Sequence, residues 1–308
     1  MSQKKTPHSP SIHNLPQGQS LARYTAARLG GPADYLYIAK DPSYSDLIPL
    51  LNQAWNRHLP VTVIGGGTNI LIADAGIRGL TIINRATEIN HEVEGDEGIV
   101  TASSGTNLIR LARYCQENGL KGMEWAIAVP GTIGGAVVNN AGAHGSDIAS
   151  SLTWTMTYDA DRGEHWIETM DMQFGYRHSR LKVRDDRRFF VMRAEFSFDR
   201  DEPEAIQRRM EHNNDYRRRT QPPGASLGSI FKNPAGDYAG RLIEAAGLKG
   251  LRVGSVQVSP VHANFFVNIG DQATARDYYK LICLVRERVD AAFGIGLELE
   301  IQTLGEWD

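Results

Sequence analysis

The sequence predicts an α+β protein built from three successive units, and three observations support this fold class. Short strand-like runs alternate with a helical pattern between residues 20 and 84. A mixed pattern with a β-hairpin occupies residues 85–200. From residue 201 to 308, three helical patterns are separated by short strands. Residues 1–19 are polar and rich in proline, so we expect a disordered tail before the first unit.

The first unit reads as a small α/β arrangement. The run YLYIA at residues 35–39 predicts a strand. Residues 43–58 predict a helix, with one apolar face formed by Leu47, Leu51, Ala54 and Trp55. The runs PVTVIGGG and LTIIN then predict two short buried strands.

The second unit combines strands with one clear helix. The run GIVTASSG predicts a strand, and residues 105–119 predict a helix that begins at Thr106 and ends at Gly119. A hairpin is expected around Asp161–Gly163. The run FFVMRAEFSF alternates, so one face of its strand should carry Phe190, Met192, Ala194, Phe196 and Phe198.

The third unit begins with a charged helix that ends at Pro222–Pro223. A second helix is expected over residues 237–247, with Asp237 as its N-cap and Gly247 as its stop. A third covers residues 272–294, with an apolar stripe through Tyr278, Leu281, Ile282, Val285 and Val289. Strands are predicted at VGSVQVS, NFFVNIG and LELEIQTLG.

Composition excludes several classes of protein. The 308 residues carry a formal charge of −3, which gives no global sign of nucleic-acid or anionic-membrane binding. No apolar run approaches the roughly 20 residues of a spanning helix, and the N-terminus lacks the apolar core of a signal peptide, so a cytoplasmic location is expected. Cys115 and Cys283 both lie in helical patterns, and we expect both to be buried and unpaired. No cluster has metal-ligand spacing, so no metal is predicted.

Two glycine-rich stretches suggest a bound phosphate. They are VIGGGTNILIADAGIRG at residues 63–79 and AVPGTIGGAVVNNAGAHG at residues 128–145. Unhindered main-chain N–H groups in such loops can hold phosphate oxygens, whereas the alternative is tight turns between strands. Two such stretches in one chain favour phosphate. Neither contains a GxGxxG or P-loop motif, so we expect a nucleotide diphosphate on a non-Rossmann scaffold.

Eight blocks in order carry a resemblance to a known family over about residues 20–308. They are TAARLGGPAD, VIGGGTNILIADAGIRGL, AVPGTIGGAVVNNAGAHG, FGYRHSRLK, LGSIFKNP, AGRLIEAAGLKG, VSPVHANFFVN and FGIGLELEIQTLGE. Together they resemble the UDP-N-acetylenolpyruvoylglucosamine reductase (UDP-N-acetylmuramate dehydrogenase) family. The resemblance implies an FAD-binding fold of the vanillyl-alcohol-oxidase type, with two FAD subdomains over residues 20–84 and 85–200. A substrate-binding domain would then occupy residues 201–308.

The resemblance also implies an activity and a set of partners. Family members pass hydride from NADPH to FAD and then to the enolpyruvyl group of UDP-N-acetylglucosamine enolpyruvate, in peptidoglycan synthesis. Non-covalent FAD, NADPH as co-substrate, a monomer and a cytoplasmic location are therefore expected. The residues expected to bind FAD lie in the two glycine-rich stretches: Gly65, Gly66, Gly67, Thr68, Asn69, Ile70, Pro130, Gly131, Thr132, Gly134, Gly135, Asn140, Ala141 and Gly142.

The resemblance assigns three catalytic residues. Adding hydride to the vinyl ether places negative charge beside the substrate carboxylate, so the site needs a cation and a proton donor. Arg177 would bind the carboxylate, Ser229 would give the proton, and Glu300 would act beside Arg177. Glu298 lies two residues before Glu300, so on a strand the two side chains would share a face. Substrate binding is expected from Tyr176, Lys232, Asn233 and His262.

Some features leave alternatives open. The run Arg217–Arg219 either meets the substrate diphosphate or, as we favour, is mostly a solvated helix end. His144 stands where the family commonly has Tyr, and no substrate-covering insertion follows GYRHSRLK, so the chain resembles the shorter subtype. Two rival functions are an oxidase with FAD linked covalently through His144 or Cys115, and a sugar-nucleotide sensor without turnover.

Overall fold

The first unit contains a mainly parallel sheet covered by one helix. The computed structural model describes residues 10–307. Its first sheet has the order β1-β2-β5-β3, with β1 at Gln19–Ser20, β2 at Pro32–Ala39, β5 at Ile77–Asn84 and β3 at Val61–Ile64. Both β2 and β3 run parallel to β5, as a crossover through α1 (Leu47–Asn56) requires. The predicted helical stripe is buried, together with Leu50.

The N-terminal segment is ordered from residue 10, so the prediction of a disordered tail is wrong for residues 10–19. A short 3₁₀ helix, η1, spans Ile12–Asn14, and the Ile12 side chain is fully buried in the core around α1. The Gln53 amide donates to the Pro10 carbonyl at 2.9 Å. One buried apolar side chain and this hydrogen bond anchor an otherwise polar segment. Residues 1–9 of the predicted tail lie outside the described residues.

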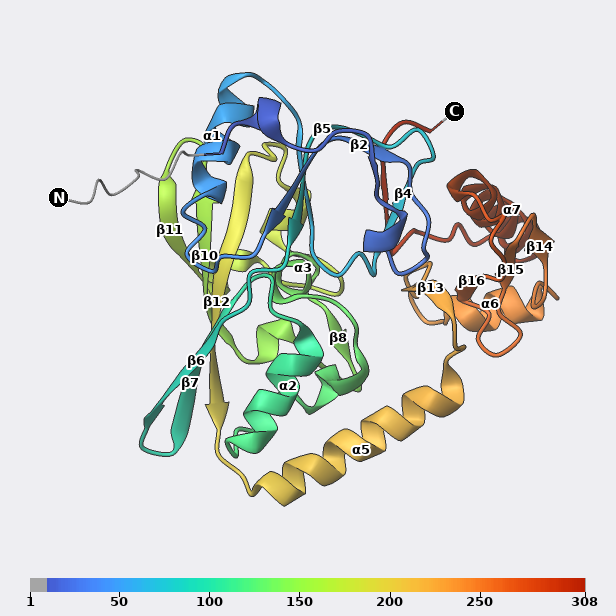
Figure 1. The fold of residues 1–308 in the computed structure, drawn as a ribbon. Coiled ribbons are helices and arrows are strands. Elements are labelled where there is room, and N and C mark those ends of the chain that lie inside the picture. The colour runs from blue at the N-terminus through green and yellow to red at the C-terminus, as the bar shows by residue number, and fades with distance from the viewer. Residues whose placement is uncertain (1–9, 308) are drawn as a thin grey trace.

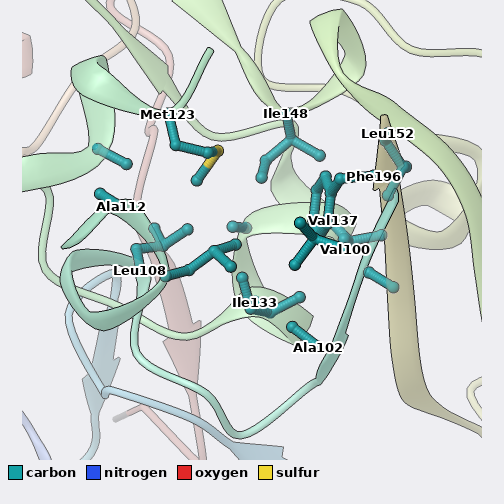
Figure 2. Close-up of a cluster of buried hydrophobic side chains, with 14 of the residues drawn as sticks. Val100, Ala102, Leu108, Ala112, Met123, Ile133, Val137, Ile148, Leu152 and Phe196 are labelled. Carbon is teal, nitrogen blue, oxygen red and sulfur yellow. The ribbon is translucent and has the colours of Figure 1, made fainter. Parts of the chain in front are cut away.

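The second unit is built on an antiparallel sheet of order β11-β10-β12-β7-β6. The strands are β6 (Ile89–Glu94), β7 (Glu97–Ser103), β10 (Leu152–Asp159), β11 (Gly163–Glu168) and β12 (Phe189–Asp199). The hairpin expected at Asp161–Gly163 joins β10 to β11. The predicted inward face of β12 is buried at all five positions. Figure 2 shows part of the core between this sheet and helices α2 and α3.

Short helices and a two-stranded ribbon complete the second unit. They are α2 (Leu108–Glu117), η3 (Glu124–Ala128), α3 (Ile133–Asn139), β8 (Gly142–Ala143), β9 (Ser146–Asp147), η4 (Ile148–Ser150), η5 (Thr169–Met172) and α4 (Arg180–Val183). Asn107, not Thr106, caps α2, because its side chain accepts from the amides of Ile109 and Arg110. Thr106 is buried instead and donates to the Glu88 carbonyl.

Helix α5 (Pro203–Thr220) connects the second and third units (Figure 1). It ends before Pro222–Pro223, as predicted. Its buried side chains Ile206 and Met210 belong to the core of the second unit. The first half of this helix therefore packs on the second unit, although the sequence places it at the start of the third. The domain boundaries themselves stay predictions.

The third unit packs helices on a small antiparallel sheet. The sheet order is β13-β16-β15-β14, with β13 at Ala225–Ser229, β16 at Phe265–Asn268, β15 at Val256–Val258 and β14 at Arg252–Val253. Helices α6 (Ala239–Ala245) and α7 (Ala275–Phe293) complete its core (Figure 1). Asp237 does not cap α6 as predicted; Asn233 accepts from the Ala239 amide, while Asp237 pairs with Arg241.

The C-terminal segment returns to the first unit. The strand predicted over LELEIQTLG is reduced to β17 (Gln302–Leu304), which pairs in parallel with β4 (Ile70–Ile72). Just before it, Leu299 forms an isolated bridge with Phe231. The last residues therefore connect the third unit to the first glycine-rich stretch. A 3₁₀ helix at Ala22–Tyr24 (η2) completes the element order, and within residues 10–307 no helix is long and apolar enough to cross a bilayer.

The buried side chain of Asn264 stabilises the third unit, which gives a test of the fold. Its Oδ1 accepts from the Phe231 amide at 2.9 Å, and its Nδ2 donates to the Phe231 carbonyl at 2.8 Å. Asn264→Ala leaves both main-chain groups buried and unpaired, so we expect the free energy of unfolding to fall by about 3 kcal/mol. Urea denaturation measures this change. Asn56→Ala, at the exposed end of α1, should change it by less than about 0.5 kcal/mol.

Candidate functional site

The two glycine-rich loops contact each other, and this contact explains several of their glycines. A Cβ on Gly65 would lie 2.0 Å from Thr132 Oγ1, and one on Gly66 would lie 2.9 Å from the Gly131 Cα. The φ angle of Gly67 is +64°, and its Cβ would lie 1.9 Å from the Tyr24 carbonyl oxygen. The absence of side chains at residues 65–67 is thus required by packing within the protein. It is not in itself evidence for a ligand.

Free main-chain N–H groups in both loops are better evidence for a bound anion. Within residues 10–307, no acceptor pairs with the amides of Gly66, Gly67, Thr68 and Asn69, nor with those of Gly131, Thr132 and Gly135. The loops lie side by side, since Thr68 Oγ1 donates to the Pro130 carbonyl at 3.2 Å. Such a cluster of unpaired donors suits the oxygens of a pyrophosphate.

The space beside Gly135 shows whether a flat cofactor ring could lie against the main chain. It is exposed in the first half of α3, and the nearest protein atom to a Cβ there would be 3.9 Å away. Packing within the protein therefore does not require a glycine at this position, and the open space beside it leaves room for a ligand against the main chain. By contrast, a Cβ on Gly134 would lie 3.0 Å from the Ser104 Cβ. The residues present fit a dinucleotide cofactor across the two loops.

Arg177 and Glu300 form the centre of the site. The Arg177 Nε donates to Glu300 Oε1 at 2.6 Å, with 22% and 13% of the two side chains exposed. The Arg177 Nη2 donates to the carbonyl of Gly142 at 3.0 Å. Arg177 has a left-handed backbone, with φ of +54°. The structure thus brings two of the three predicted catalytic residues into contact, directly beside the second glycine-rich stretch.

The main chain next to Ser229 is hydrogen-bonded to the main chain of Glu300. It ends β13 opposite Phe265, and the carbonyl of the next residue, Ile230, accepts from the Glu300 amide at 2.8 Å. The Ser229 side chain is partly exposed, and its hydroxyl has no hydrogen-bond partner in the described part of the chain. It is therefore free to donate to a ligand.

Glu298 does not join Glu300, contrary to the expectation from strand spacing. No regular strand forms over residues 298–300, so the alternation of side chains does not apply. The Glu298 side chain is 76% exposed and accepts from Lys232 Nζ at 3.1 Å. Lys232 is thereby held at the edge of the site.

Lys182 is a site residue that the sequence reasoning missed. Its Nζ donates to the main-chain carbonyl of Arg177 at 3.0 Å. Burial lowers the pKa of this ammonium, the charges of Lys232 and Arg177 lower it further, and Glu300 opposes the shift. Lys182 closes the FGYRHSRLK block, but no periodic pattern links it to Arg177. Only the sharp turn at residues 175–178 brings the two together.

Arg217 also lies nearer the site than predicted. Its pKa is lowered by burial and by the charge of Arg177, and it donates to Gln221 Oε1 at 2.7 Å. The prediction that most of this run is a solvated helix end is confirmed by the exposed Arg218 and Arg219, and Arg217 is the exception. Within the last turn of α5, the Arg217 side chain is the one that lies near Arg177, while its neighbours Arg218 and Arg219 face solvent.

Several predicted site residues have structural contacts instead. The Asn140 side chain is buried and bonds Asp147, Gly175 and Ala149, so only its main chain is left for a cofactor. Asn233 bonds the first turn of α6. His262 accepts from the Asn264 amide through Nδ1, and its ring packs on Phe265. Tyr176 is 58% exposed, with the Arg177 guanidinium over its ring.

The side chains considered for covalent attachment differ in access. Cys115 is buried, which raises the pKa of its thiol to about 12 and makes it unreactive. Cys283 is exposed on α7, so the prediction that both cysteines are buried is wrong for it. His144 lies against Tyr216 and lines a cavity of about 570 Å³ beside α5. Its pKa is lowered by burial and by Arg217 and His212.

Comparisons with known proteins find relatives that cover nearly the whole chain. The family described as "FAD binding domain" matches residues 37–164, and "UDP-N-acetylenolpyruvoylglucosamine reductase, C-terminal domain" matches residues 220–304. The UDP-N-acetylenolpyruvoylglucosamine reductase of Rubrobacter xylanophilus is 42% identical over 94% of each chain, and that of Bacillus pumilus is 39% identical over 94% of each. The crystal structure of the Thermus caldophilus enzyme aligns with a TM-score of 0.79 at 32% identity, covering 94% of this chain and 98% of that one. The predicted FAD-binding fold is confirmed.

The geometry of Gly135 predicts how flavin binding can be abolished. Gly135→Val places a branched side chain in the open space where we expect the ligand, so the purified variant should lose its flavin absorbance while its melting temperature stays within a few degrees of flavin-free wild type. Gly296→Val is the matched control, because a Cβ there meets no atom within 4 Å and the residue is exposed. A Gly135→Val protein that retains full yellow colour would contradict the prediction that the two glycine-rich loops bind the flavin cofactor.

Proposed function

The chain belongs to the UDP-N-acetylenolpyruvoylglucosamine reductase family, and we propose that Arg177, Ser229 and Glu300 form its catalytic site. It is an FAD-dependent oxidoreductase that uses NADPH to reduce the enolpyruvyl group of UDP-N-acetylglucosamine enolpyruvate, giving UDP-N-acetylmuramate for peptidoglycan. One observation carries the assignment of the site. The Arg177–Glu300 ion pair joins residues 123 positions apart, and its arginine donates to the carbonyl of Gly142 in the second glycine-rich stretch.

Arg177 binds the substrate carboxylate in this proposal. Two of its five N–H groups are taken by Glu300 and Gly142, which fix the plane of the guanidinium. The remaining donors stay available for a carboxylate, and the guanidinium cannot lose its proton. When bound, FAD supplies the hydride that reduces the double bond. Arg177 then stabilises the negative charge that develops beside the carboxylate.

Ser229 donates the proton in this proposal. A serine hydroxyl is a weak acid, so its conjugate base needs nearby positive charge. Arg177, Lys182 and Lys232 gather around Glu300 and supply that charge. The free hydroxyl and the main-chain link from Ile230 to Glu300 support the assignment. Glu300 orients Arg177 and remains close enough to interact with the carboxylate region of the substrate.

The finer predictions extend this proposal. We place the enzyme in the cytoplasm as a monomer with non-covalent FAD, acting in cell-wall biogenesis and through it in cell shape and division. The buried, unreactive Cys115 weakens the covalent-oxidase alternative. Burial and the charges of Arg217 and His212 lower the pKa of His144. Acid precipitation that leaves the flavin in solution would exclude a covalent bond between FAD and this ring.

The first test of the function is NADPH consumption by the full-length protein. We expect oxidation of NADPH, followed at 340 nm, to depend on added UDP-N-acetylglucosamine enolpyruvate. UDP-N-acetylglucosamine, which lacks the reducible double bond, is the matched control and should give no sustained turnover. A sugar-nucleotide sensor would bind the enolpyruvyl compound without consuming NADPH, and an oxidase would consume oxygen without it.

The proton donor is tested by separating the two half-reactions. Ser229→Ala should leave NADPH reduction of the flavin within about twofold of wild type. Reoxidation by the enolpyruvyl substrate should slow by roughly 10²–10⁴-fold, the usual contribution of a positioned acid. Ser226→Ala on the same strand is the control and should leave both phases unchanged. Wild-type rates of both phases in Ser229→Ala would assign the proton to another group.

A further inference from the structure

Lys182 makes the contact that holds Arg177 in an unfavourable backbone conformation. Its Nζ donates to the Arg177 carbonyl at 3.0 Å, and Arg177 has a φ of +54°. A residue with a Cβ pays about 1 kcal/mol or more to adopt this left-handed region. The hydrogen bond from a charged donor offsets that cost. The ammonium therefore acts on the backbone that sets the direction of the Arg177 side chain.

The position of Lys182 is itself fixed on the second glycine-rich stretch. Ser179, which is fully buried, caps the short helix α4 by accepting from the Lys182 amide at 3.2 Å. The same hydroxyl donates to the Val138 carbonyl of α3 at 2.6 Å. Leu181 is buried in the core of the second unit. Hydrogen bonds thus connect α3 to Ser179, Ser179 to Lys182, and Lys182 to the main chain of Arg177.

The charge of Lys182 is not cancelled by a direct carboxylate contact. Arg177 pairs with Glu300, and Lys232 pairs with Glu298. In the part of the chain that the structure describes, Lys182 forms no ion pair within 4 Å, and its only hydrogen-bond acceptor is the neutral carbonyl of Arg177. The site therefore has a net positive charge, which suits a substrate that carries a carboxylate.

We propose that Lys182 is a positioning residue for the reductase reaction. Its ammonium holds the main chain of Arg177 so that the guanidinium faces the substrate carboxylate, and its uncompensated charge strengthens the field that Arg177 and Ser229 depend on. This inference rests on the proposed function of Arg177.

The first experiment replaces the lysine with a neutral side chain of similar length. In the FAD-loaded Lys182→Met protein, flavin content and the rate of flavin reduction by NADPH should stay within about twofold of wild type. The KM for the enolpyruvyl substrate should rise about tenfold, and reoxidation of the reduced flavin should slow by a similar factor. Arg180→Met is the matched control, because it removes a cation from the exposed side of the same helix and should change neither value.

The pH profile separates this role from a merely structural one. Because burial holds the pKa of Lys182 below its usual value, kcat/KM should fall as pH rises through that pKa and the ammonium loses its charge. The groups that face this ammonium are Arg177, Lys232 and Glu300. Lys182→Arg keeps the charge at all these pH values, so the alkaline decline should move to higher pH. This variant also keeps the test open if Lys182→Met fails to fold.

The outcomes distinguish the inference from the proposed function. Wild-type protein that consumes no NADPH with the enolpyruvyl substrate would overturn both. Active wild type, with a Lys182→Met variant of unchanged KM and reoxidation rate, would overturn the role of Lys182 alone. The role of Lys182 would also be overturned if kcat/KM of Lys182→Arg fell at the same alkaline pH as that of wild type.

Discussion

The ion pair between Arg177 and Glu300 is the interaction on which the candidate site depends. It joins the second unit to the C-terminal segment across 123 positions of sequence, at a Nε–Oε1 distance of 2.6 Å. An exposed pair of this kind would contribute little, but these side chains are mostly buried, and Arg177 also donates to the Gly142 carbonyl. Separating the partners would leave a charged group partly buried without compensation, which is costly. The pair therefore holds the segment around Glu300 in place.

A chain of polar contacts extends from this pair to both glycine-rich loops. Asn69 donates from its side chain to the Glu300 carbonyl and accepts at its own carbonyl from the Gln302 amide. On the other side, Asn140 binds the Gly175 carbonyl two residues before Arg177. Hydrogen bonds thus connect the two glycine-rich loops, which carry the unpaired amides, to the Arg177–Glu300 pair.

The sequence predicted local features well and non-local ones poorly. The stripe of α7, the inward face of β12 and the end of α5 follow from periodicity and proline, which act over a few residues. The family blocks led us to propose Arg177, Ser229 and Glu300 as catalytic residues, and the arrangement of these three needs the C-terminal return that no local pattern encodes. Periodicity also failed at Glu298, because an isolated bridge replaced the expected strand. Gly65 and Gly67 suggested a ligand, whereas their nearest constraint is another loop of the same chain.

The charges of the site bear on the proposal that Ser229, a weak acid, donates the proton. Lys182 lies near two other cations, Arg177 and Lys232, and near the mostly buried carboxylate of Glu300, while Lys232 also pairs with the exposed Glu298. If negative charges surrounded Ser229, they would strongly destabilise its alkoxide. If a carboxylic acid stood in its place, nearby positive charges would favour loss of its proton. The hydroxyl keeps its proton at neutral pH and gives it up only when negative charge develops beside it. The excess of positive charge therefore favours both retention of the substrate carboxylate and use of a hydroxyl as the acid.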